Sequence, residues 1–87
     1  MSEETELPSK NDLQKHWVDD ARIAAKINEA IELAEQSKWE ESEARLVRAE
    51  EDLEDWQPYD SSDVYYKGIW KGQIAKVRKY HSERNPV

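Results

Sequence analysis

The sequence predicts an all-α protein, a small three-helix bundle made of an antiparallel helical hairpin and a C-terminal helix. Three observations lead to this fold class. Both glycines and all three prolines lie outside residues 9–57, so no residue in that stretch breaks a helix. Apolar residues recur at steps of three and four, which is the helical period, and turn-forming residues separate the periodic segments. The expected helices run near residues 10–37, 39–56 and 62–82.

The first expected helix has its start signals near residue 10. Asp12 is placed to cap it, with Asn11 as the alternative, and Leu7 and Leu13 are placed to clip its entry. A stripe of apolar residues then runs along one side as far as Ser37. This stripe consists of Trp17, Ala21, Ala24, Ile27, Ile31 and Ala34. Its alanines are small, so we expect a second helix to approach closely.

The second expected helix has the most regular period in the chain. Its inner stripe consists of Trp39, Ser42, Leu46, Ala49, Leu53 and Trp56, and Ser42 is the only polar residue among them. Glutamate and aspartate occupy most of the remaining positions, so the outer surface is expected to be acidic. The connection around residues 36–38 is short, which makes the first two helices antiparallel neighbours.

The third expected helix follows a proline-containing break. Pro58 disfavours helical geometry at Gln57, and the polar run 60–63 offers several caps for a new helix. At 100° per residue, one side of this helix is predicted to face the hairpin; it carries Tyr66, Ile69, Trp70, Gln73, Val77 and Tyr80. A narrow basic stripe lies about a third of a turn away and consists of Lys67, Lys71 and Arg78.

The chain of 87 residues is long enough for one domain with a thin core. We expect a disordered acidic tail over residues 1–8, a single domain over 9–83 and a flexible end over 84–87. Cysteine is absent, so packing of apolar side chains must supply the stability.

Charge is distributed unevenly along the chain, whose net charge is -7. Residues 1–63 hold 7 Lys/Arg against 19 Asp/Glu, whereas residues 64–87 hold 6 against 1. Two explanations of this asymmetry stay open: either acidic helices pack beside a basic one and neutralise each other, or one or both faces are complementary to a partner. No membrane span and no signal peptide is evident, so a soluble, cytoplasmic protein is expected.

A segment of the chain resembles part of a tetratricopeptide repeat. The segment is INEAIELAEQSKWEESEARLVRAEEDLEDWQP, Ile27 to Pro58. Trp39 takes the aromatic position after the turn, Leu46 the large position and Ala49 the small position of the second helix, whereas Ser42 stands where the family prefers alanine. The resemblance implies one helical hairpin followed by a third helix, in a scaffold that binds proteins or peptides without chemistry of its own.

Catalytic signatures are lacking in the sequence. There is no phosphate-binding loop and no nucleophile motif, and His16 and His81 are far apart without cysteine neighbours. The carboxylate pairs at helical spacing are those of a solvated acidic face, while a catalytic acid requires a desolvating pocket. We therefore expect no enzyme activity, no cofactor and no metal.

A protein-binding module, either an adaptor or a small inhibitor, is the function that these features favour. Its acidic helical hairpin would dock on a basic surface of a protein partner. The expected contact residues on the acidic face are Glu40, Glu43, Glu50, Glu51, Glu54 and Asp55. The expected aromatic anchors are Trp39, Trp56 and Tyr59.

Two alternatives use the C-terminal helix. In the first, Lys67, Lys71 and Arg78 contact nucleic-acid phosphates while Trp70 or Tyr65 stacks on a base, although the acidic remainder of the chain disfavours such a ligand. In the second, the acidic hairpin of one copy pairs with the basic helix of another, and the protein is a homo-oligomer.

Overall fold

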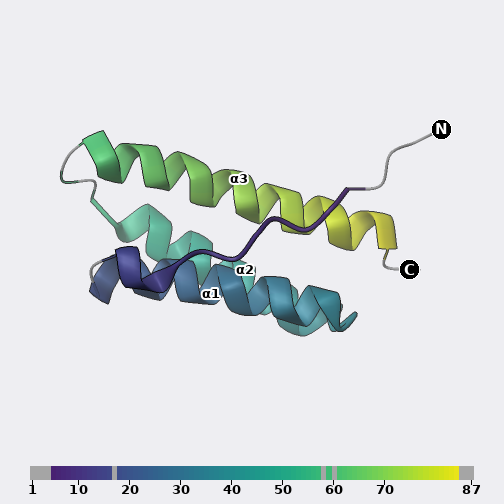
Figure 1. Ribbon diagram of the computed structural model, residues 1–87. Helices are drawn as coiled ribbons and strands as arrows, with labels where there is room; N and C mark the ends of the chain where they lie inside the picture. Colours follow the sequence, from purple (N-terminus) through teal and green to yellow (C-terminus); the bar gives the residue numbers. More distant parts are fainter. Residues whose placement is uncertain (1–4, 17, 58, 60, 85–87) are drawn as a thin grey trace.

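The computed structural model describes residues 5–16, 18–57, 59 and 61–84. Within these residues it contains a 3-10 turn, η1 (Leu13–Lys15), and three α-helices: α1 (Val18–Glu35), α2 (Trp39–Asp55) and α3 (Ser61–Arg84). The predicted all-α three-helix bundle is therefore confirmed (Figure 1). No helix in the described part of the chain is both long and apolar enough to cross a membrane.

The start of the first helix was predicted wrongly. In place of a helix from residue 10, the carboxylate of Asp12 accepts a hydrogen bond from the backbone N–H of Gln14 and caps the short η1 turn. Extended backbone at His16 then ends this turn, and α1 begins at Val18. Trp17, expected on the inner stripe, lies outside the described residues.

The segment before η1 is held against the helices by side-chain hydrogen bonds. The Asn28 side chain accepts from the backbone N–H of Asn11 at 2.7 Å and donates to its carbonyl at 3.0 Å. The Asn11 side chain also donates to Oε1 of Gln73 at 2.9 Å, which joins the segment to α3. These polar contacts explain why an aperiodic stretch lies along the bundle (Figure 1).

Residues 5–8 also lie beside α3. The backbone N–H of Thr5 donates to Glu83 at 2.9 Å, Arg84 donates to the Thr5 carbonyl at 3.1 Å, and Leu7 packs against the core. The tail over 1–8, the domain over 9–83 and the flexible end over 84–87 stay predictions. Residues 1–4 and 85–87 lie outside the described residues.

The connection between α1 and α2 is short and reverses the chain without a glycine. Ser37 adopts the left-handed conformation, with φ of 61°. The N–H of Lys38 donates to the Leu33 carbonyl at 2.9 Å and the N–H of Ser37 to the Ala34 carbonyl at 3.0 Å. This is the hydrogen-bond pattern of the Schellman motif, which usually has glycine at the left-handed position. The resulting antiparallel pair of helices agrees with the prediction.

The core lies where α3 packs over the hairpin. It consists of Ile23, Ala24, Ile27, Ala30, Ile31, Ala34, Leu46, Ala49, Leu53, Trp70, Ile74 and Val77. The four alanines leave room for α1 and α2 to approach closely. The structure buries four residues of α2, and all four belong to its predicted inner stripe: Ser42, Leu46, Ala49 and Leu53.

The inward face of α3 is rotated from the predicted one. Trp70 and Val77 are buried as expected, but Ile74 and His81 are buried as well. Tyr66, Ile69, Gln73 and Tyr80 are only half-buried. The rotation arises because the N-terminal segment covers one flank of α3, where Gln73 donates to the Ser9 carbonyl at 3.3 Å.

Candidate functional site

The six predicted contact carboxylates of α2 divide into two sets with different surroundings. Glu43 and Glu50 turn toward α3, where the guanidinium of Arg78 lies between them, 2.9 Å from one and 2.5 Å from the other. The hydrogen bond from Arg78 lowers the pKa of Glu50, and the two carboxylates raise the pKa of Arg78. These predicted contact residues therefore hold α3 against α2 instead of forming an open docking face.

The second set faces solvent and consists of Glu40, Glu51, Glu54 and Asp55, which we call the outer acidic stripe. At 100° per residue these four side chains lie within an arc of about 100° on α2. None of them takes part in an ion pair within the described residues. Ala44 and Val47 lie in the same arc, and Val47 is 40% exposed. The stripe thus surrounds a small apolar centre with negative charge.

The three predicted aromatic anchors are not equally accessible. Trp39 is half-buried against Tyr80 and His81, with ring centroids 6.0 and 5.7 Å away, and Trp56 is half-buried with its ring 5.4 Å from that of Trp70. Tyr59 is 94% exposed. Tyr59 is therefore the anchor that a partner can reach without repacking of the core.

Two of the three residues of the predicted basic stripe, Lys67 and Arg78, are half-buried against α2, whereas Lys71 is exposed. Arg78 pairs with α2 carboxylates, and Nζ of Lys67 donates to the Trp56 carbonyl at 3.5 Å. Trp70 is fully buried, and its Nε1 donates to the Asn11 side chain at 3.3 Å. Trp70 therefore cannot stack on a nucleic-acid base in this fold, which corrects its assignment to an alternative binding face. Tyr65, at 66% exposed, remains accessible.

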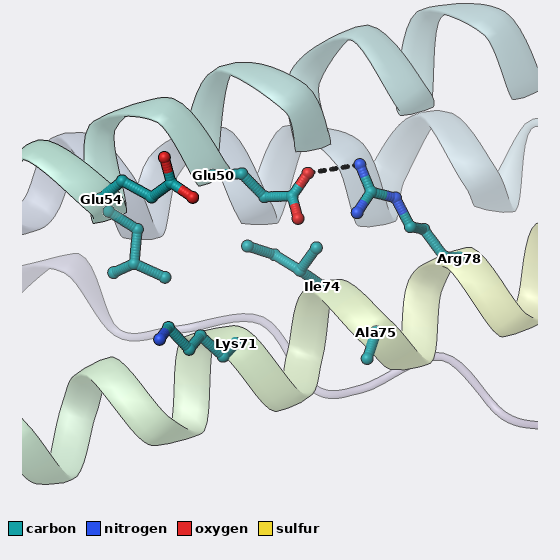
Figure 2. Close-up of a pocket in the computed structure, with 7 residues that line it drawn as sticks. Glu50, Glu54, Lys71, Ile74, Ala75 and Arg78 are labelled. Atoms are coloured by element: carbon teal, nitrogen blue, oxygen red, sulfur yellow. Dashed lines mark hydrogen bonds and ion pairs between the residues drawn. The ribbon is translucent and has the colours of Figure 1, made fainter.

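A groove of about 280 Å³ runs between α2 and α3 and is called the α2–α3 groove below. Its lining consists of Glu50, Leu53 and Glu54 from α2 and Lys71, Ile74, Ala75 and Arg78 from α3 (Figure 2). Buried apolar side chains form its floor, while charged side chains stand at both edges. The sequence patterns placed the acidic and the basic residues of this lining on separate faces. The apolar period of each helix predicts which of its sides faces inward, but it does not predict how two helices are packed against each other.

A buried polar cluster, which sequence reasoning missed, lies at the other end of the bundle. Oγ of Ser42 is 2.7 Å from the Ala30 carbonyl oxygen and 2.8 Å from Nε2 of His81. Nδ1 of His81 is 3.6 Å from Glu43. The polar Ser42 within an apolar stripe was the available signal, but its partner is 39 residues away.

The order serine, histidine, carboxylate resembles a catalytic triad, yet the hydrogen bonds give it another role. A carbonyl oxygen only accepts, so the single hydroxyl proton of Ser42 goes to Ala30, and Nε2 of His81 must be the donor to Ser42. The hydroxyl is also fully buried. The cluster joins all three helices, and its serine is not oriented as a nucleophile.

Acidification is expected to destabilise the fold through His81. Burial lowers the pKa of His81; the negative charge of Glu43 opposes this shift and the positive charge of Arg78 adds to it. Since the folded-state pKa lies below the unfolded one of about 6.5, the stabilising effect is complete above that value and is lost as pH falls through the folded pKa. The midpoint of urea unfolding should therefore decrease from pH 7.5 to 5.5. His81→Gln, which keeps a donor but does not titrate, should remove this decrease; an equal decrease in the variant would contradict the assignment.

Metal-binding side chains do not gather in the part of the chain that the structure describes: no three His, Asp or Glu residues form a cluster there. His16 instead packs edge-on against Tyr66 and Trp70, with centroids 4.7 and 5.2 Å away. The absence of a metal, a cofactor and an enzyme activity stays a prediction. Comparison with models of protein families, with curated proteins and with solved structures finds no match.

Proposed function

We propose that this protein is a non-catalytic binding module, an adaptor or small inhibitor, that docks on a basic surface of a protein partner. The observation that supports the proposal most is the outer acidic stripe. Its carboxylates point to solvent without ion pairs among the described residues, although α3 supplies several cations. Arg78 pairs with Glu43 and Glu50, so part of the acidic surface holds the helices together, while the rest faces outward.

The composition of the stripe suits an interface of moderate affinity. Exposed charge pairs contribute roughly 0.2–1 kcal/mol each and mainly accelerate association with a partner of opposite charge. Val47 at the centre and Tyr59 beyond the end of α2 offer apolar contacts. The hairpin that carries the stripe is the segment with tetratricopeptide-like spacing, and this relationship is part of the proposal.

Nucleic acid is the less supported ligand. Trp70 is buried and Arg78 is already engaged by two carboxylates. Three lysines of α3 do face solvent: Lys71, Lys76 and Lys79. Their attraction for phosphates is opposed by the net charge of -7 on the whole chain. A polyanion approaching the protein therefore meets repulsion over most of its surface.

Reversal of the stripe tests this function. Tagged protein is used to capture partners from a lysate at about 50 mM and about 500 mM salt. We expect a protein partner that binds the wild type at low salt and is lost from Glu40→Lys/Glu51→Lys/Asp55→Lys. The matched control Lys76→Glu/Lys79→Glu, on the solvent side of α3, should retain it.

The proposal fails if the control loses the partner and the stripe variant retains it. Nuclease-sensitive material bound by the wild type and lost from the control would replace the proposal with the nucleic-acid alternative.

A further inference from the structure

The α2–α3 groove has walls of opposite charge. Glu50 and Glu54 stand on the α2 wall, and Lys71 and Arg78 stand on the α3 wall (Figure 2). Between them lies an apolar floor that includes Leu53 and Ile74, both nearly fully buried. The floor exposes little apolar surface, so an occupant of this groove is selected mainly by charge: it must present a cation to the α2 wall and an anion to the α3 wall.

The two ends of the groove differ in how their charges are satisfied. At one end Arg78 spans the groove and binds Glu50 at 2.5 Å. At the other end Glu54 and Lys71 are both exposed, and neither forms an ion pair among the described residues (Figure 2). These two charges are the ones available to an incoming surface.

We propose that the occupant is a second copy of this chain, in a two-fold symmetric dimer formed through the α2–α3 groove. In such a dimer the same patch on each copy meets itself, so every contact occurs twice. A patch with one acidic and one basic wall is complementary to itself only when the acidic wall of each copy faces the basic wall of the other. This inference stands apart from the proposed basic partner and does not require it.

The charges select the direction of the symmetry axis. An axis across the groove would place α2 over α2 and bring the two acidic walls together. An axis along the groove places α2 of each copy over α3 of the other. Residues that stand opposite each other across the groove in one copy then face each other between the two copies. Glu54 of one copy then meets Lys71 of the other, twice per dimer.

The surface of α3 permits this approach. Ala75 is exposed in the groove, and Gly68 and Gly72 lie on the same side of α3 with open space beside them, so three small residues let another helix approach there. α2 has 17 residues and is about 25 Å long, which gives an extended contact between helices. Repulsion between two chains of net charge -7 is screened beyond about 8 Å at physiological ionic strength, while contacts between Glu54 and Lys71 are closer than that.

Sedimentation equilibrium of single and mixed charge reversals tests the dimer. Wild type should pass from monomer to dimer between about 10 and 500 µM in about 0.15 M salt. Glu54→Lys alone and Lys71→Glu alone should each weaken dimerisation at least about tenfold, because each creates two like-charge contacts. An equimolar mixture of the two variants should dimerise again, since both contacts then join opposite charges.

Two further measurements keep the outcome unambiguous. Circular dichroism should show unchanged helix content in both variants, because neither side chain has an ion-pair partner in its own chain among the described residues. Ala75→Glu, which places a bulky anion in the groove, should also abolish the dimer. A wild type that stays monomeric, single variants that dimerise like the wild type, or a mixture that stays monomeric would each overturn the proposal.

Discussion

Replacing Trp70 with alanine is expected to lower the free energy of unfolding by about 3–5 kcal/mol. The indole is fully buried, and its ring stacks on Tyr66 with centroids 5.8 Å apart while Trp56 lies 5.4 Å away. Its N–H also donates to Asn11. One side chain thus joins α3 to the end of α2 and to the N-terminal segment.

This loss is large against the stability of so small a domain. A chain of 87 residues is expected to unfold at a cost of about 4–13 kcal/mol, so the variant should be at the edge of folding. Urea unfolding followed by circular dichroism measures the change. Tyr65→Ala, at an exposed position on the same helix, is the matched control and should change stability by at most about 0.5 kcal/mol. Similar losses in both variants would contradict the placement of α3.

Truncation of Leu46 is expected to have the second largest effect, a loss of about 2–5 kcal/mol. Leu46 lies on the inner side of α2 and is fully buried in the core, whereas its neighbour Val47 is 40% exposed on the outer side. Val47→Ala should therefore change stability by only about 0.5 kcal/mol.

The pair of substitutions measures the rotation of α2 about its own axis. If Val47→Ala cost as much as Leu46→Ala, the helix would be turned by about a quarter revolution and the outer acidic stripe would not face solvent. Both free energies come from the same urea titrations, so the comparison is internal.

Sequence periodicity predicted the orientation of α2 well because nearly every inward residue there is apolar and the outward ones are charged. The orientation of α3 was predicted less well. Its apolar and aromatic residues extend around more than half of the helix circumference, so the helical period does not indicate which side faces the core. The N-terminal segment determines which side of α3 faces the core, because it covers the flank at Gln73. That segment has no periodic pattern, so its position could not be predicted.

The candidate site shows the same limit. Glu43, Glu50 and Glu54 look alike in the sequence, and only the position of Arg78 on another helix separates internal pairing from outward display. A signal was nevertheless present: Glu43 and Glu50 are seven residues apart and border the buried stripe, so a cation on a neighbouring helix can reach both. Ser42 carried a second signal, since a hydroxyl at an apolar position requires a buried partner.

The most direct measurement of the proposed function is the dissociation constant of the captured partner, determined by calorimetry for wild type and for Glu40→Lys/Glu51→Lys/Asp55→Lys. At about 0.5 kcal/mol for each of three charge contacts, the variant should bind at least about tenfold more weakly, with most of the difference lost at about 500 mM salt. Equal affinities at low salt would contradict the assignment of the outer acidic stripe as the binding surface.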